Sequence, residues 1–422
     1  MLYMWHNGTI SYSFTVIIMV SKARGNHGAS APVEEMRLLH KRAICGTRYR
    51  MRLTIQLKLQ PTPEQAANLQ RTLRRANEAC DYISRVAWES NTFGQFPLHR
   101  LSYASVRETF GLAAQLTVRC IAKVADAYKL DKQAQRSFQP LGALAYDQRI
   151  LSYTRTTSAV SIWTLEGRQT IPFVCGERQR QMLAFRRGET DLAFVRGEWY
   201  LFATCEKETP EPIEVDDVLG VDLGVTNIAT DSDGTIHQDK GLKHIRYRHR
   251  SLRNKLQKKA TLSAKRRLRK LAGQERRFAK DVNHTISKRL VSVAKRTKRA
   301  IALEDLKGIR SRMRARRQQR TVLHSWSFFQ LRAFVLYKAA LAGVPVVFVD
   351  PRNTSRTCPS CGHSAKANRP NQATFCCVSC GCAGHADTIA AENIRVLGRA
   401  AVMQPYVSEA ASPSCQRQAI GL

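Results

Sequence analysis

Four cysteines near the C-terminal end of the sequence have the spacing of a zinc site. Cys358 and Cys361 form one C-x-x-C pair, Cys377 and Cys380 form a second, and fifteen residues separate the pairs. Each pair in a tight turn can bring two thiolates to one cation, and two pairs complete the tetrahedron that zinc accepts. Because four protein ligands leave no open position, we expect one structural zinc ion per chain.

Two alternatives to this interpretation follow from the same residues. The cysteines could form disulfides or be inert buried thiols, although disulfides are rare in a reducing compartment. Spacing alone also leaves neighbouring side chains as alternative ligands, namely Cys376, Cys382, His363 and His385. We predict that the regular set of four cysteines binds the metal.

An aspartate follows the second cysteine pair, at the start of a predicted helix. Asp387 precedes Ala390, Ala391 and Ile394 at helical spacing. An acidic residue in this position is most often a cap or a partner of the helix dipole. A catalytic role therefore requires other carboxylates that could share a metal ion with it.

Two apolar stretches supply such carboxylates. Asp222 lies inside the predicted strand VLGVDL, where a carboxylate is costly to bury unless it is paired or bound to a metal. A second predicted strand, AIALEDL at 300–306, ends in Glu304 and Asp305. Since side chains alternate along a strand, only one of these two acids can face a shared site.

The composition points to a polyanionic partner. The chain has 422 residues, enough for two or three domains, a formal net charge of +35 and a pI near 10.3. Such an excess of Lys and Arg is typical of proteins that bind nucleic acid. No run of eighteen apolar residues is present, and the apolar window at 10–20 lacks the flanks of a signal peptide, so we expect no membrane association and a cytoplasmic location.

The positive charge is concentrated in residues 243–299, which contain 22 Lys or Arg and two acids. Apolar residues recur there at helical spacing, so one helix face should pack while the rest stays cationic. Phosphate groups would neutralise this self-repelling surface better than solvent does. The candidate nucleic-acid contacts are Lys258, Lys259, Arg266 and Arg267.

The remaining elements divide the chain into two main parts. RLTIQLKL, beginning near 51, predicts a strand, and a helical pattern follows it to about residue 136. Short alternating runs from 158 to 207, broken by EGR, CGE, RGE and RGE turns, predict a β-meander or small barrel with the helices inserted in it. The acidic, proline-bearing stretch 208–217 predicts a linker, and a new domain starts at 218.

Several of these motifs resemble those of one protein family, over residues 51–395. Their order and spacing are similar to those of the TnpB (OrfB) proteins of insertion sequences and of the related miniature type V CRISPR nucleases. The landmarks are GVDLGVTNIAT, LEDLKGIR, LHSWSFFQL, TSRTCPSCG, FCCVSCG and DTIAAENI.

The resemblance implies a multidomain protein of α+β and α/β type. An N-terminal wedge-like β-barrel with an inserted helical module would precede a RuvC-like RNase H fold that carries an inserted four-cysteine zinc ribbon. The implied parts are an extension at 1–50, barrel and helical module at 51–207, linker at 208–217, nuclease domain at 218–353, zinc ribbon at 354–383, last nuclease helix at 384–397 and tail at 398–422.

The resemblance also implies a site and a function. Asp222, Glu304 and Asp387 would bind two catalytic Mg²⁺ ions, and a monomer carrying a guide RNA from the transposon end would cut target DNA beside a short flanking motif. Ile389 departs from the family, which usually has Asn there, so we expect altered hydrogen bonding around intact ligands. The alternatives are a guided DNA-binding repressor that does not cleave, and an accessory transposase of the element, for which the sequence offers no recognisable nucleophile.

Overall fold

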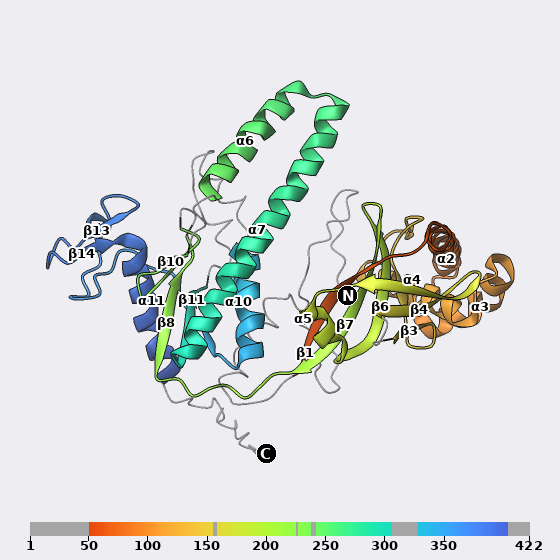
Figure 1. Cartoon of the computed structure of the whole chain (residues 1–422), viewed down its shortest axis with the longest axis horizontal. Coiled ribbons are helices and arrows are strands. Elements are labelled where there is room, and N and C mark those ends of the chain that lie inside the picture. The colour runs from red at the N-terminus through yellow and green to blue at the C-terminus, as the bar shows by residue number, and fades with distance from the viewer. Residues whose placement is uncertain (1–49, 155–157, 225–226, 238–241, 306–327, 404–422) are drawn as a thin grey trace, which may run out of the picture. The chain divides into compact units, whose positions relative to one another are not determined.

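A computed structural model describes residues 50–154, 158–224, 227–237, 242–305 and 328–403 (Figure 1). The described chain divides into two compact units, 50–208 and 209–403. The N-terminal extension, most of the C-terminal tail, the basic run 310–320 and parts of LEDLKGIR and LHSWSFFQL lie outside the described residues.

The first unit opens with the predicted strand and helices. In β1 (Arg50–Leu59), buried side chains alternate with more exposed ones. Thr62 then starts α2 (Pro63–Glu89) through a capping box: its Oγ1 accepts from the Gln65 backbone N at 3.2 Å, and its own N donates to Gln65 Oε1 at 3.1 Å. The helices α3 (Gln95–Phe110) and α4 (Ala114–Leu130) complete the inserted helical part.

The strands of this unit form one seven-stranded sheet in the order β2-β6-β7-β1-β5-β4-β3. The sheet curls so that its two edges approach each other. The Tyr153 hydroxyl on the edge strand β3 donates to Thr190 Oγ1 on β6, next to the opposite edge, at 3.1 Å. It is therefore a nearly closed form of the predicted barrel. The elements are β2 (Leu144–Tyr146), β3 (Leu151–Thr154), β4 (Ala159–Thr164), β5 (Gly167–Val174), α5 (Glu177–Leu183), β6 (Arg186–Val195) and β7 (Glu198–Glu208).

Three local predictions for this sheet were wrong. The strands β2 and β3 precede residue 158, where the pattern predicts none, because three or four residues are too few for alternation to be recognised. CGE at 175–177 leads into α5 instead of a simple turn. RGE at 187–189 lies within β6, where Gly188 has a φ of 74° and the pairing with β7 shifts register, so it marks a bulge.

The second unit contains a mixed sheet in the order β10-β9-β8-β11-β12. The strands β8 (Asp217–Asp222), β11 (Arg299–Glu304) and β12 (Val346–Val349) run parallel to one another. The strands β9 (Ala229–Asp231) and β10 (Ile236–His237) are added antiparallel at the edge of β8.

Helices cover both faces of this sheet. Leu219 and Leu303 face a core shared with α7 (Leu262–Arg296) and α10 (Phe328–Ala342). Val218 and Ala302 face the other way, toward Ile394 of the helix α11 (Ala386–Met403). The helix α6 (Leu242–Lys259) packs along α7 (Figure 1). An ion pair between Arg253 and Glu275 joins the two helices. None of the described helices combines the length and apolar composition that a bilayer span needs.

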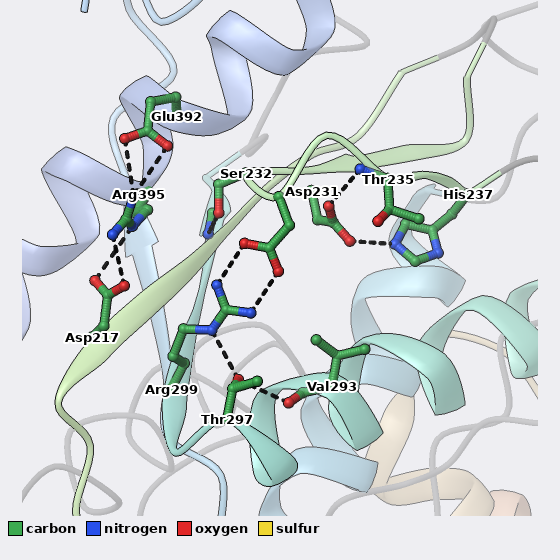
Figure 2. Close-up of polar contacts among 12 residues, drawn as sticks. Asp217, Asp231, Ser232, Thr235, His237, Val293, Thr297, Arg299, Glu392 and Arg395 are labelled. Carbon is green, nitrogen blue, oxygen red and sulfur yellow. Dashed lines mark hydrogen bonds and ion pairs between the residues drawn. The ribbon is translucent and has the colours of Figure 1, made fainter.

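The C-terminal helix α11 (Ala386–Met403) lies in backbone contact with β8. A Cβ added to Gly220 would be 2.1 Å from the carbonyl oxygen of Ala391 and 2.5 Å from the backbone N of Arg395. Arg395 also donates to Asp217 Oδ2 at 2.7 Å, at the start of the same strand (Figure 2). Glycine at 220 therefore sets how closely the helix approaches the sheet.

We predict that Gly220→Ala destabilises the second unit. The added methyl group meets backbone, which cannot rotate away, so the cost should be about 1–3 kcal/mol, as for other overpacked cores. Thermal unfolding followed by circular dichroism should show a melting temperature several degrees lower. Gly384→Ala is the matched control, because its new methyl group would lie 3.5 Å from Ile389 Cδ1, an ordinary contact. Equal melting temperatures for the two variants would contradict the argument.

Candidate active site and metal centre

Strand alternation brings two of the predicted acids to the same face of the sheet. Asp222 follows Val218 and Gly220 at even positions along β8, and Glu304 follows Ala302 in the same way on β11. Because β8 and β11 are parallel and pair Val221 with Leu303, the two carboxylates end neighbouring strands. Both therefore lie on the face covered by α11.

The third acid comes from that helix. Asp387 is in the first turn of α11 and only 8% exposed, and the approach of the helix at Gly220 brings it to the ends of β8 and β11. Its Oδ2 accepts from Asn227 Nδ2 at 2.9 Å, and its Oδ1 accepts from an Arg369 guanidinium nitrogen at 3.2 Å. Three separate segments thus deliver Asp222, Glu304 and Asp387 to one region.

The electrostatics of Asp222 reflect this convergence. Burial, together with repulsion by the carboxylates of Glu304 and Asp387, raises the pKa of Asp222 to about 8, against the opposing effect of Arg369. Burial also raises the pKa of Glu304, and the hydrogen bond from Thr354 partly offsets this rise. Like charges held this close are unfavourable without a compensating cation, which is the condition under which a carboxylate cluster takes up a metal ion.

Asp305, the other acid at the end of AIALEDL, has a different environment. Its Oδ1 accepts from Arg332 on α10 at 3.2 Å, on the opposite face of the sheet from α11. Glu304, and not Asp305, therefore lies on the same face of the sheet as Asp222. This is the face that α11, which carries Asp387, covers.

The structure also shows polar residues around the acids that sequence reasoning missed. Thr354 Oγ1 donates to Glu304 Oε1 at 2.6 Å, and Asn393 Nδ2 donates to the carbonyl oxygen of Thr354 at 2.7 Å. Asn227, Thr354 and Asn393 lie within GVDLGVTNIAT, TSRTCPSCG and DTIAAENI, so a residue-by-residue examination of those motifs could have found them. Arg369 lies in the loop between the cysteine pairs, where no pattern singles it out.

The four predicted cysteines form a compact sulfur cluster. All four Sγ atoms lie within 4.8 Å of one another, with Cys358 and Cys380 at 3.5 Å and Cys361 and Cys377 at 3.6 Å. Sulfurs bound tetrahedrally to zinc with bonds of about 2.3 Å are separated by about 3.8 Å, so the cluster fits this ion. Among the described residues, no other group of three or more His, Cys, Asp or Glu side chains is gathered as tightly.

Two similar turns build the cluster. The backbone N of Gly362 donates to the Cys358 carbonyl at 3.0 Å, and that of Gly381 donates to the Cys377 carbonyl at 2.9 Å. Both glycines have φ near 70°, a conformation that side chains other than glycine rarely adopt. Hydrogen bonds from the backbone N–H groups of Cys361 and Ser360 lower the pKa of Cys358 to about 6, which favours the thiolate that binds metal.

The alternative ligands do not belong to this cluster. Cys376 and His363 are exposed, and His385 is half-buried at the end of β14 (Ala383–His385), which pairs with β13 (Thr374–Cys376). Cys382 accepts a hydrogen bond from Ser360 Oγ at 3.4 Å. Ile389 packs on the buried Phe375 beside the cysteines, so apolar contact occupies this position.

The basic segment forms the two helices α6 and α7. The proposed contacts Lys258 and Lys259 end α6, and Arg266 and Arg267 lie in the first turns of α7. All four side chains are exposed, while the apolar face of α7 is buried against the sheet. The segment therefore presents its cations to solvent, as its sequence predicts.

Comparison with known proteins gives a consistent result. A family model described as a probable transposase matches residues 202–309, and one described as Cas12f1-like, TNB domain, matches residues 328–394. A TnpB-like protein of Methanocaldococcus jannaschii is 30% identical over 44% of this chain and 71% of its own length. The putative RNA-guided DNA endonuclease InsQ of Escherichia coli is 28% identical, over 48% of this chain and 55% of the relative.

Two further similarities connect the chain to Cas12f proteins. The CRISPR-associated endodeoxyribonuclease Cas12f1 of Syntrophomonas palmitatica is 28% identical over 48% of this chain, but the match covers only 44% of that relative. The structure of a Cas12f1–sgRNA–target DNA complex has a similar fold, with a TM-score of 0.53 and 14% identity over 78% of this chain and 82% of that one. Together with the described geometry, these similarities mean that the chain belongs to the TnpB (OrfB) family, which is related to the miniature type V CRISPR nucleases.

Proposed function

We propose that this protein is an RNA-guided DNA endonuclease encoded by an insertion sequence, with a RuvC-like site that hydrolyses DNA phosphodiesters. The observation that carries the proposal is the convergence of Asp222, Glu304 and Asp387 from three segments; burial, with added repulsion from the other two carboxylates, raises the pKa of Asp222 to about 8. The mixed sheet with helices on both faces is consistent with an RNase H fold for residues 218–353 and 384–397. The ribbon at 354–383 would be an insertion before the last acid.

The carboxylates would hold the catalytic metal. Mg²⁺ prefers oxygen ligands, and two such ions, when bound, supply an activated water and charge stabilisation at the leaving oxygen. Asp222 and Glu304 end neighbouring strands, and Asp387 begins the helix that covers the same face, so the three carboxylates would share the bound metal. Asn227 and Arg369 orient Asp387, and Arg369 contributes a positive charge to a cluster of negative ones.

The basic helices would bind the nucleic acids. Guide RNA and target DNA both present phosphates, which the exposed cations of α6 and α7 can neutralise without reading sequence. Sequence would be read by base pairing with the guide, and the protein would recognise the shape of the heteroduplex and a short flanking motif. InsQ is described as a putative RNA-guided DNA endonuclease, and the Cas12f1 complex contains an sgRNA and a target DNA.

The alternative function in this family is that of a guided DNA-binding repressor that does not cleave DNA. Loss of the acidic site would favour it, whereas here all three acids are present and converge. The family model for residues 202–309 is described as a probable transposase, which keeps an accessory role in transposition as a second candidate.

The first prediction from the proposed function tests the three acidic residues. Asp222→Asn, Glu304→Gln and Asp387→Asn should each reduce divalent-dependent DNA cleavage to background while nucleic-acid affinity stays nearly unchanged, because each removes a metal ligand and no phosphate contact. Cleavage and gel-shift assays with guide RNA measure the two effects. Asp350→Asn is the control, since that carboxylate is 64% exposed just beyond β12. Full cleavage by Asp222→Asn would reject the catalytic assignment.

The second prediction tests the cysteine cluster. Cys358→Ser should lose the one zinc ion expected per chain and much of the order of the ribbon, because a structural zinc site contributes on the order of 10 kcal/mol. Metal content is measured by mass spectrometry after extensive dialysis. Cys376→Ser should keep its zinc, because this neighbouring thiol lies outside the cluster. A wild-type protein without zinc but with full activity would contradict the proposal.

The third prediction concerns the basic helices. Exchange of Lys258, Lys259, Arg266 and Arg267 for Gln should weaken binding of all sequences alike and reduce the slope of log affinity against log salt by about three to four units. Titrations at several salt concentrations, with matched and mismatched targets, provide the measurement. If the preferred flanking motif changed while the slope did not, these residues would be reading bases.

A further inference from the structure

The Thr354 hydroxyl is placed to control the orientation of Glu304. Thr354 is 4% exposed, and its Oγ1 lies 2.6 Å from Glu304 Oε1 and 3.2 Å from the carbonyl oxygen of Pro351. A hydroxyl group has one proton to donate, and both the shorter distance and the charge of the acceptor favour the carboxylate. One oxygen of Glu304 is thereby held in place.

The segment that carries Thr354 is itself fixed by α11. Asn393 Nδ2 donates to the carbonyl oxygens of Thr354 and Thr357 at 2.7 and 2.8 Å. Asn393 is 8% exposed and lies less than two turns after Asp387 on the same helix. The helix that carries one acid therefore also holds, through Asn393, the hydroxyl that orients another.

The same segment leads into the cysteine cluster. Thr354 and Cys358 are separated by three residues, and the backbone N of Thr357 donates to the Asn353 carbonyl at 3.0 Å, which keeps the connection short and ordered. A glutamate has three rotatable side-chain bonds, and repulsion from Asp222 would turn an unrestrained Glu304 away from it. The hydrogen bond from Thr354 to one oxygen of Glu304 opposes this rotation.

We infer that Thr354 is a positioning residue that holds Glu304 ready to bind a divalent cation and links the cysteine ribbon to the acidic site. This inference rests on the proposed function. A purely structural role, in which the hydroxyl only satisfies a buried polar group, makes a different prediction: removal would change stability and leave metal affinity unaltered.

Three variants of the 422-residue chain test the inference. Thr354→Val removes the hydroxyl and keeps the shape, Thr354→Ser keeps the hydroxyl, and Thr357→Val removes a hydroxyl from the same segment that bonds to Asn353 and Ser364 instead of an acid. Binding of Mn²⁺ to the RNA-free protein, measured by calorimetry, is the main readout, with Glu304→Gln as the reference for a lost ligand. Zinc content, melting temperature and Mg²⁺-dependent cleavage are measured in parallel.

Thr354→Val should bind Mn²⁺ about 10–100-fold more weakly, the usual effect of removing a hydrogen-bond partner of a metal ligand, and cleave correspondingly less. Thr354→Ser and Thr357→Val should resemble the wild type, and all three variants should retain zinc. Wild-type Mn²⁺ affinity in Thr354→Val, an equal loss in Thr354→Ser, or loss of zinc from Thr354→Val would each overturn the positioning role. A wild type that binds Mn²⁺ but does not cut would reject the proposed function, while the comparison of Mn²⁺ affinities would still decide the role of Thr354.

Discussion

The backbone contact between α11 and β8 is the constraint on which the acidic site depends. At Gly220 the helix lies so close to the strand that a single methyl group would collide with its main chain. This approach places the first turn of α11 beside the carboxyl ends of two parallel strands, so Asp387 meets Asp222 and Glu304, which are far away in sequence. A helix displaced by one side-chain layer would leave the aspartate as an ordinary helix-capping residue. Gly220, which lies two positions before Asp222, therefore sets this arrangement.

Bringing three carboxylates together is unfavourable, and the surrounding contacts offset part of this cost. Arg369 and Asn227 each donate to one oxygen of Asp387, and Thr354 donates to Glu304. Burial and the neighbouring carboxylates raise the pKa of Asp222 to about 8, and burial raises the pKa of Glu304. Complete neutralisation by arginine would remove the need for a metal ion, whereas the partial compensation seen here holds the acids in place and leaves net negative charge for a cation to bind.

The sequence predicted the parts of this site that follow from short-range patterns. Cysteine spacing identified the cluster, and an acid inside the apolar strand VLGVDL identified Asp222, because both signals lie within a few residues. Alternation alone could not distinguish Glu304 from Asp305, since it says that they differ in direction but not which direction contains Asp387. The choice of Glu304 came from the family resemblance. Arg369 could not be predicted at all: its role comes from the path of a loop without periodic structure. The strands β2 and β3 were missed for the related reason that very short strands carry too little pattern.

The cysteine ribbon appears in sequence as an insertion, yet residues at its start and in its middle contact the acids. Thr354 precedes the first cysteine pair and bonds Glu304, Arg369 lies between the pairs and bonds Asp387, and Asp387 itself comes seven residues after Cys380. Folding of the ribbon therefore fixes donors on two carboxylates that belong to different elements. A four-cysteine site has no open position for chemistry, so its contribution to catalysis would be geometric. By closing the 23 residues from Cys358 to Cys380 into a loop, it would reduce the conformations available to the donors that hold the acids together against their mutual repulsion.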